Sequence, residues 1–216
     1  MTHEHPHEHR HEHPHGHPTQ PDLEDAGYSR YQVLAQALEE LLIAKGIITA
    51  EGMRKGIEAL DAADPAWGAR LVARCWVDAG FEARVLESTD AAAVELGLNL
   101  GSTPIHAVKD TPQVHHVVVC TLCSCYPSAL LGEKPDWYKS RAYRARVVRE
   151  PRAVLAEFGT ILPEDMSIQV HDSTAEHRYI VLPMRPEGTE AMTETELAVC
   201  VTRDCMIGVA LPRAAP

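Results

Sequence analysis

Three closely spaced cysteines are the residues of this sequence with the clearest capacity for chemistry. Cys120, Cys123 and Cys125 fall within six residues, whereas the other three cysteines are scattered at positions 75, 200 and 205. Six cysteines in 216 residues are too few for a disulfide scaffold. In a reducing compartment such a cluster therefore indicates metal binding or catalysis.

Four kinds of chemistry compete for this cluster. A redox pair of Cys120 and Cys123 would normally open a helix, and the third thiol would interfere with it. Structural zinc needs four ligands, usually as two pairs from separate loops, and an iron–sulfur cluster needs a fourth cysteine at suitable spacing. The sequence offers neither, so the pattern favours a compact claw, formed by residues 120–125, that binds one metal ion.

The claw offers both sulfur and nitrogen donors. Spacings of three and two bring the sulfurs to one side of a tight turn, with the backbone amides of Ser124 and Cys125 beneath them. A trivalent ion can acidify those amides, and the donor set then favours low-spin Co(III) or Fe(III) over zinc. A sixth, open position on a Lewis-acidic ion suits the activation of water or of a nitrile. The predicted metal ligands are Cys120, Cys123, Ser124 and Cys125, and the predicted catalytic residues are the last three.

The segment VHHVVVCTLCSCYP resembles the metal-binding signature of the nitrile hydratase α subunit and of the related thiocyanate hydrolase γ subunit. Three later segments resemble the same family's downstream blocks in the same order, so that the resemblance covers roughly residues 25–212; they read DWYKSRAYRARVVREPR, RYIVLPMRPEGTE and VTRDCMIGV. The resemblance implies a heteromeric hydro-lyase that converts nitriles to amides at a non-corrin Co(III) centre, with Fe(III) as the alternative.

The resemblance also implies a role for each claw residue. Cys120 would be an unmodified thiolate, Cys123 a sulfinate and Cys125 a sulfenate, while Ser124 and Cys125 would supply amide nitrogens. Thr121 matches the cobalt type. Arginines that compensate the oxidised sulfurs would come from a partner β subunit, in a heterodimer or heterotetramer. A separate activator protein is a further possible partner.

Two departures from the nitrile hydratase pattern keep a second substrate open. Ser128 stands where many nitrile hydratases have Trp, and where the thiocyanate hydrolase γ subunit commonly has Arg. Residues 156–159, residues 203–205 and the His-rich N-terminus resemble that γ subunit more closely. We therefore expect the α subunit of a cobalt-type nitrile hydratase, active only with its partner. The alternatives are a thiocyanate hydrolase γ subunit and a metal-storage or delivery protein.

The expected reaction is addition of water to the nitrile carbon, followed by tautomerisation to the amide. Either the metal or the sulfenate oxygen of Cys125 would activate the water, and both alternatives stay open. Because hydration transfers no electrons, the ion would act as a Lewis acid.

Composition sets the broad class of the protein. Hydrophobic residues make up 45% and charged residues 24%, an ordinary globular balance. The formal net charge of −11 argues against nucleic-acid binding. No apolar run approaches the roughly 20 residues of a membrane helix, and no secretory signal is visible, so we expect a cytoplasmic location.

The chain is expected to have three parts and an α+β fold. Residues 1–24 form a tail, with histidine at every odd position from 3 to 17, and are predicted to be disordered. The tail is a purification tag, a solvated extension or a weak reservoir for divalent cobalt, nickel or zinc. Residues 25–100 are expected to form a helical arm, and residues 101–216 a mixed α/β layered domain that carries the claw and the catalytic site.

Apolar spacing and capping residues predict the helices. A helix from Tyr31 should stop at Gly46, and Thr49 should cap the next one. Pro65 should be the first residue of a third helix, and Pro151 should begin one that Gly159 ends. Further helices are predicted at residues 81–96 and 135–148, and after a capping box of Thr193 and Glu196.

Strands are predicted in the second half of the chain. Residues 114–119 should lead directly into the cysteine cluster. Residues 166–170 and 178–182 should form a strand pair joined through Asp172 and Ser173, and residues 206–211 a last strand.

Several other side chains have both a structural and a functional interpretation. At most one of His115 and His116 can face the claw, and a hydrogen-bonded strand histidine is the simpler expectation. His171 and His177 should lie at the surface. Three arginines should either anchor the claw or the subunit interface, or form ordinary salt bridges: Arg178, Arg185 and Arg203. Core packing is expected for Tyr126 and Trp137, which could also pack beside the metal, and for Trp67, Cys75 and Trp76.

Overall fold

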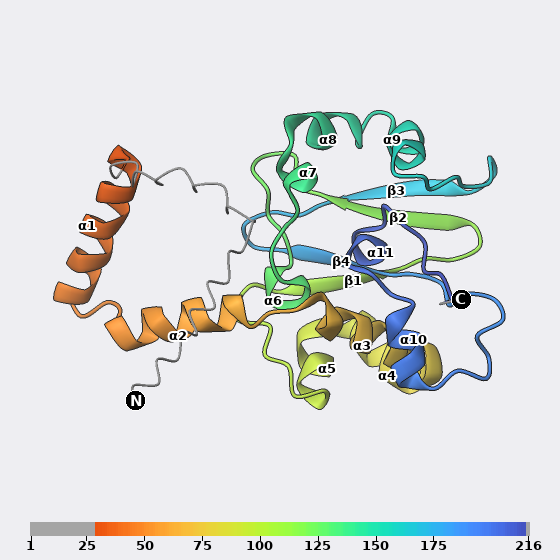
Figure 1. Cartoon of the computed structure of the whole chain (residues 1–216), viewed down its shortest axis with the longest axis horizontal. Coiled ribbons are helices and arrows are strands. Elements are labelled where there is room, and N and C mark those ends of the chain that lie inside the picture. Colours follow the sequence, from red (N-terminus) through yellow and green to blue (C-terminus); the bar gives the residue numbers. More distant parts are fainter. Residues whose placement is uncertain (1–28, 215–216) are drawn as a thin grey trace, which may run out of the picture. The chain divides into compact units, whose positions relative to one another are not determined.

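The computed structural model describes residues 29–214, except for the side chains of residues 59 and 60 (Figure 1). The predicted His-rich tail lies outside the described residues. The chain divides into two compact units at residues 50 and 51. The predicted division into tail, helical arm and α/β domain stays a prediction.

The described part of the first unit is helix α1 (Arg30–Ala44), which confirms the helix predicted from Tyr31. Ser29 and Gln32 form a capping box at its start: the Ser29 hydroxyl accepts from the Gln32 amide, and the Gln32 side chain accepts from the Ser29 amide. The helix ends before Gly46, which has a φ of +67°. The apolar stripe that predicted this helix is exposed in the structure: Tyr31, Leu34, Leu38 and Leu41 are 50–82% exposed.

Four helices open the second unit: α2 (Ala50–Asp61), α3 (Pro65–Val77), α4 (Ala79–Glu87) and α5 (Thr89–Glu95). Helix α2 begins directly after Thr49, and Pro65 is the first residue of α3, both as predicted. Cys75 belongs to the core, and Trp67 and Trp76 pack partly buried against it. The prediction of one helix over residues 81–96 is wrong. Ser88 is extended there and its hydroxyl caps α5, so a capping side chain divides the segment.

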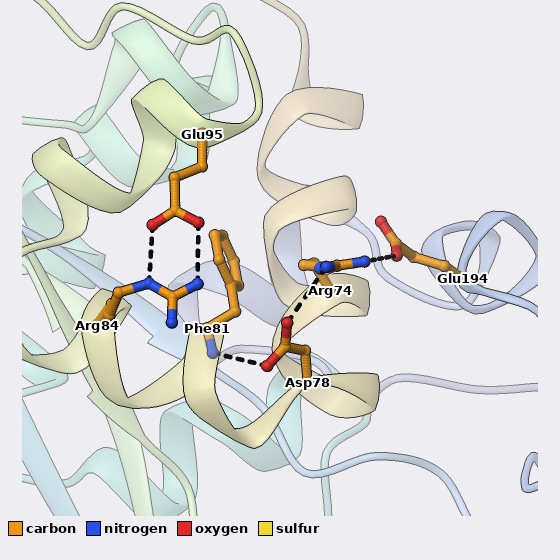
Figure 2. A network of polar contacts seen from close by, with 6 residues as sticks. All are labelled: Arg74, Asp78, Phe81, Arg84, Glu95 and Glu194. Carbon is orange, nitrogen blue, oxygen red and sulfur yellow. Dashed lines mark hydrogen bonds and ion pairs between the residues drawn. The ribbon is translucent and has the colours of Figure 1, made fainter.

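A polar network ties these helices to α10 (Glu194–Val199), whose predicted capping box of Thr193 and Glu196 is present. Figure 2 shows Arg74 of α3 donating to Asp78 and to Glu194, each at 3.2 Å. Arg84 donates to both carboxylate oxygens of Glu95, at 2.8 and 2.9 Å, and so joins α4 to α5.

The strands form two small parallel sheets. Strand β1 (Ile105–Lys109) pairs with β4 (Arg178–Leu182), and β2 (Val114–Val119) pairs with β3 (Ser167–Asp172). Strand β2 has its predicted bounds. The predicted pairing of the segments that became β3 and β4 is wrong, because each pairs in parallel with an earlier strand instead. Parallel partners need a long crossover connection, so strands adjacent in sequence are poor candidates for pairing in this fold.

Four short helices follow the claw: α6 (Ser128–Leu131), α7 (Asp136–Lys139), α8 (Arg141–Arg146) and α9 (Pro151–Glu157). The single helix predicted over residues 135–148 is wrong, since Ser140 is extended and caps α8 through the amide of Tyr143. Helix α9 confirms the predicted start at Pro151, and Gly159 follows it with a φ of +81°.

The predicted last strand over residues 206–211 is wrong. The chain there forms helix α11 (Arg203–Ile207), because Thr202 caps its start and Gly208, with a φ of +84°, ends it. A Cβ on Gly208 would collide with the carbonyl oxygen of His116 in β2. This close approach of two backbones explains why the segment turns at a glycine.

The second unit is a mixed α/β arrangement, as predicted in outline. Helices α3, α4, α5 and α10 lie on one side of the strands, and α7, α8 and α9 lie on the other (Figure 1). The core fills the space between them, and Val117, Val118 and Val119 of β2 are completely buried. No helix of the described residues is long and apolar enough to cross a bilayer.

Candidate metal centre

Strand β2 places the cysteine cluster at its carboxyl end. The buried valines fix the strand, and Cys120 follows it directly with 1% exposure. The Sγ atoms of Cys120 and Cys123 lie 3.6 Å apart, and those of Cys123 and Cys125 lie 3.3 Å apart. All three sulfurs lie within 4.8 Å of one another, and no other group of three or more potential ligands among residues 29–214 is comparably close.

These distances fit a single metal ion. Two sulfurs bound at about 2.3 Å lie about 3.3 to 3.8 Å apart for bond angles between a right angle and a tetrahedral one. The two shortest sulfur separations fall in that range. The structure thus brings together three of the four predicted ligand residues as sulfur donors. Thiolate ligands suit a late transition metal.

The backbone of Ser124, the fourth predicted ligand residue, contacts the Cys123 sulfur, and its role as a metal ligand stays a prediction. Hydrogen bonds from the Cys125 thiol and from the backbone of Ser124 lower the pKa of Cys123 to about 7. The backbone of Cys125 lowers the pKa of Cys123 as well, so both backbone amides act on this sulfur. Partial burial, with the Cys123 thiol next, raises the pKa of Cys125 to about 11.

Polar side chains from three other elements hold the claw. Asp172, at the end of β3, accepts from the amide of Thr121 at 2.9 Å and from its hydroxyl at 2.5 Å. Lys134 donates from Nζ to the Ser124 carbonyl at 3.0 Å, and Arg144 donates to the Thr121 carbonyl at 3.4 Å. The loop geometry thus depends on groups up to 51 residues away in the sequence.

Two buried tyrosines complete this support. The Tyr138 hydroxyl donates to the Cys125 carbonyl at 2.7 Å, and the Tyr143 hydroxyl donates to the Val118 carbonyl at the same distance. The rings pack edge-on and tilted in a cluster with Tyr126, Trp137 and Phe158. Trp137 is therefore a packing residue, as expected, and its ring lies 4.8 Å from that of Phe158.

A cavity of about 770 Å³ opens beside the claw. Cys123, Ser124 and Cys125 line it, and its apolar wall includes Trp67, Leu98 and Leu100. Its polar lining includes Ser128, Lys134 and Arg178. The guanidinium of Arg178 acts to lower the pKa of Cys125, although burial outweighs it. This places a positive charge on the claw side of the cavity.

The remaining predicted residues fall into different places. Tyr126 lines the cavity, and its hydroxyl, although buried, has no hydrogen-bond partner among the described residues. Arg185 bonds to Thr189, and Arg203 pairs with Asp204 at 3.4 Å, so these two form local contacts. Of the three arginines, Arg178 lies with the claw.

The two histidines of β2 make structural contacts and do not lie with the claw sulfurs. His115 is 2% exposed and bonds to the Gly208 carbonyl at 2.7 Å and to Asp110 at 3.0 Å. His116 contacts His171, with ring nitrogens 2.7 Å apart, so His171 is half-buried and its predicted surface position is wrong. His177 is exposed, as predicted.

Spacing in the sequence does not identify Lys134, Tyr138, Arg144 or Asp172 as residues that support the claw. Lys134, Tyr138 and Arg144 follow the claw residues that they bind by 10, 13 and 23 positions, a spacing with no regular pattern, and Asp172 was expected in a turn. Their shared feature is a bond to a backbone atom of the claw, which only the folded chain displays.

The site and the fold together define a mixed α/β protein with three cysteine sulfurs at the end of a buried strand, spaced so that one metal ion would fit among them. The family model of the nitrile hydratase α chain matches residues 29–210. The chain therefore belongs to the nitrile hydratase α-chain family.

Individual relatives differ in metal and substrate. The thiocyanate hydrolase γ subunit of Thiobacillus thioparus is 44% identical over 197 residues, which cover 86% of this chain and 81% of that one. The α subunit of the low-molecular-weight cobalt-containing nitrile hydratase of Rhodococcus rhodochrous is 46% identical over 179 residues, covering 82% and 86%. A solved double mutant of the Fe-type nitrile hydratase of Comamonas testosteroni superposes with a TM-score of 0.74 at 40% identity, covering 86% and 94%.

Proposed function

We propose that this chain is the metal-carrying α subunit of a cobalt-type nitrile hydratase, active with a β subunit in the cytoplasm. The observation that carries the proposal is the group of three cysteine sulfurs, within 4.8 Å of one another, at the wall of a cavity. Cys120, Cys123, Ser124 and Cys125 would hold the ion, as Co(III), with Cys123 and Cys125 oxidised. A bound trivalent cobalt ion would supply the Lewis acidity for nitrile hydration.

The residues of this chain would bind and orient the nitrile. Trp67, Leu98 and Leu100 present apolar surface to its organic group and exclude water from that side. Ser128, with its small side chain, leaves room for a substituted nitrile. The nitrile group would then point toward the claw wall, where Cys125 and Ser124 lie.

Charge and rigidity at the claw support catalysis. Arg178 would stabilise negative charge on the oxidised sulfur of Cys125, since its guanidinium already acts to lower the pKa of that thiol. Lys134 and Tyr138 bind the carbonyls of Ser124 and Cys125, which fixes the two peptide units whose nitrogens would serve as ligands. The partner's arginines would complete the charge compensation, and an activator protein would install the metal.

Thiocyanate hydrolysis at the same kind of centre is the second candidate. The observation that favours it is the 44% identity to the thiocyanate hydrolase γ subunit, over more residues than the nitrile hydratase match spans. Lys134 and Arg178 in the lining would suit the charge of thiocyanate, but so small an ion leaves the apolar wall uncovered, which an organic nitrile would fill better.

Co-expression of the chain with its neighbouring subunit in cobalt medium tests the proposal. The purified complex is analysed for cobalt and assayed with acetonitrile, an aromatic nitrile and thiocyanate. We expect one cobalt per chain and amide formation from the nitriles. Activity on thiocyanate alone would replace the primary proposal with the second candidate.

A matched pair of variants separates the claw from general thiol effects. Cys123→Ser removes a claw sulfur, whereas Cys205→Ser changes a buried cysteine in α11 that bonds to Thr202. We expect Cys123→Ser to abolish both cobalt binding and activity and Cys205→Ser to keep bound cobalt. Exchangeable zinc without turnover in the unaltered complex would indicate metal storage instead.

A further inference from the structure

A second pair of potential metal ligands lies outside the claw, on the edge formed by β1 and β4. His106 is the second residue of β1, and His177 directly precedes β4. Both side chains are exposed, and the two elements are held in register by the parallel pairing of Ile105 with Arg178. Two residues 71 positions apart in sequence thus meet where the pairing of β1 with β4 begins.

The separation of their ring nitrogens matches a chelate. Nε2 of His106 and Nδ1 of His177 lie 3.1 Å apart. Two imidazole nitrogens bound at about 2.0–2.1 Å to one ion lie about 2.9 to 3.4 Å apart, for angles between a right angle and a tetrahedral one. The observed separation falls within this range.

A second pair of contacting histidines within residues 29–214 provides a contrast. The nitrogens of His116 and His171 are 2.7 Å apart, too close for two ligands of one ion, and both rings are half-buried. Burial lowers the pKa of both histidines and so favours their neutral forms, in which one ring can donate to the other. The exposed pair is therefore the one with the spacing and the access for a metal.

We propose that His106 and His177 bind a labile divalent late first-row transition-metal ion, such as Zn²⁺, Ni²⁺ or Co²⁺, with water completing its coordination. Neutral imidazole is the preferred ligand of these ions, and two protein ligands give a weak, exchangeable site. The guanidinium of Arg178, which donates to the carbonyl of His177 at 3.4 Å, adds a nearby positive charge that further favours exchange.

The site borders the cavity of the claw without sharing its ligands. Ile105 and Arg178, the neighbours of the two histidines, both line that cavity. The site would therefore hold an ion near the cavity that leads to the cysteines. The proposal concerns this pair alone and does not depend on the reaction proposed for the claw.

Residue-resolved footprinting of the full chain tests the site, since histidines elsewhere in the sequence also bind zinc. The protein is treated with diethyl pyrocarbonate, which acylates free imidazole nitrogen, across a zinc titration, and each histidine is quantified by peptide mass spectrometry. At zinc about ten times above the dissociation constant, mass action leaves roughly a tenth of the pair free, so acylation of His106 and His177 should slow about tenfold and with one midpoint.

Substitution of one partner distinguishes a chelate from independent single ligands. His177→Gln keeps a hydrogen-bonding side chain but removes the imidazole, and it should abolish zinc protection of His106. His171→Gln serves as the matched control, in which protection of His106 should persist. If His106 stays unprotected by zinc in the unaltered chain, or stays protected in His177→Gln, the proposed site is wrong. Circular dichroism of each variant verifies that it is folded.

Discussion

The hydrogen bond from Tyr138 to the claw has an effect that can be isolated by substitution. Tyr138 is completely buried, and its hydroxyl lies 2.7 Å from the Cys125 carbonyl, the usual length of a good O–H···O bond. Tyr138→Phe keeps the aromatic packing but leaves that carbonyl unpaired. The loss should be about 1–2 kcal/mol, between the net contribution of a hydrogen bond and the cost of an unsatisfied buried acceptor.

The location of this loss decides its consequence. If the lost free energy destabilises the ion-binding conformation of the claw, the affinity for the ion falls about tenfold for each 1.4 kcal/mol. Tyr143→Phe is the matched control, because Tyr143 is 5% exposed and makes a bond of equal length to Val118, within strand β2. Both variants should lose similar free energy of unfolding in urea titrations. Only Tyr138→Phe should also lose cobalt.

Cobalt retention is the assay for this prediction. The cobalt-loaded complex is incubated with a chelator, and cobalt per chain is followed by elemental analysis over time. Equal loss of cobalt from both variants would refute the reasoning, because the effect would then come from general destabilisation. Unchanged retention in Tyr138→Phe would show that the hydroxyl does not position the claw.

Three further predictions concern the framework. His115 has acceptors at both ring nitrogens, and although burial lowers its pKa, Asp110 and the Gly208 carbonyl outweigh this and leave the pKa raised. The stabilisation by His115 is therefore fully present below the unfolded pKa of about 6.5 and is lost as pH rises through the folded pKa, with a slope of at most about 1.4 kcal/mol per pH unit. Urea unfolding from pH 6 upward should show this slope, and Asp110→Asn should remove it. The neighbouring His116 and His171 have lowered pKa values and change the free energy of unfolding only at lower pH. Gly208→Ala should destabilise the fold by about 3 kcal/mol or more in urea titrations, because it adds a collision with the His116 carbonyl to the strain of positive φ. Gly159→Ala is the control: the space around this glycine is open, so the variant should lose only about 1 kcal/mol from the strain of positive φ. Lys134→Met removes the bond to the Ser124 carbonyl and should speed cobalt loss to a chelator, whereas Lys139→Met, which breaks only an exposed pair with Asp136, should leave cobalt retention unchanged.

Local signals in the sequence determined many of the element boundaries. Pro65 and Pro151 begin helices, Gly46 and Gly159 follow helix ends with positive φ, and Thr193 with Glu196 forms a capping box. These features depend on backbone groups within a few residues, so the chain carries them wherever it folds. The spacing of Cys120, Cys123 and Cys125 is local in the same sense, and the sulfurs meet because the turn is short.

Two capping serines show where apolar spacing alone mispredicts helix boundaries. Ser88 and Ser140 each interrupt a segment whose apolar spacing suited one continuous helix. A serine in a helical pattern either continues the helix or caps a new one, and the spacing of apolar residues does not distinguish the two outcomes. At both positions the serine backbone is extended and its hydroxyl accepts from an amide three residues on, so a new helix begins.

The sequence by itself thus determined the claw, its strand and the family to which the chain belongs. Only the tertiary structure decided that β3 and β4 pair with different strands. It alone also brought Asp172, Lys134 and Tyr138 to the claw and His106 to His177. The physical reason is that parallel pairing and side-chain support join residues far apart in the chain, where no spacing in the sequence records the contact.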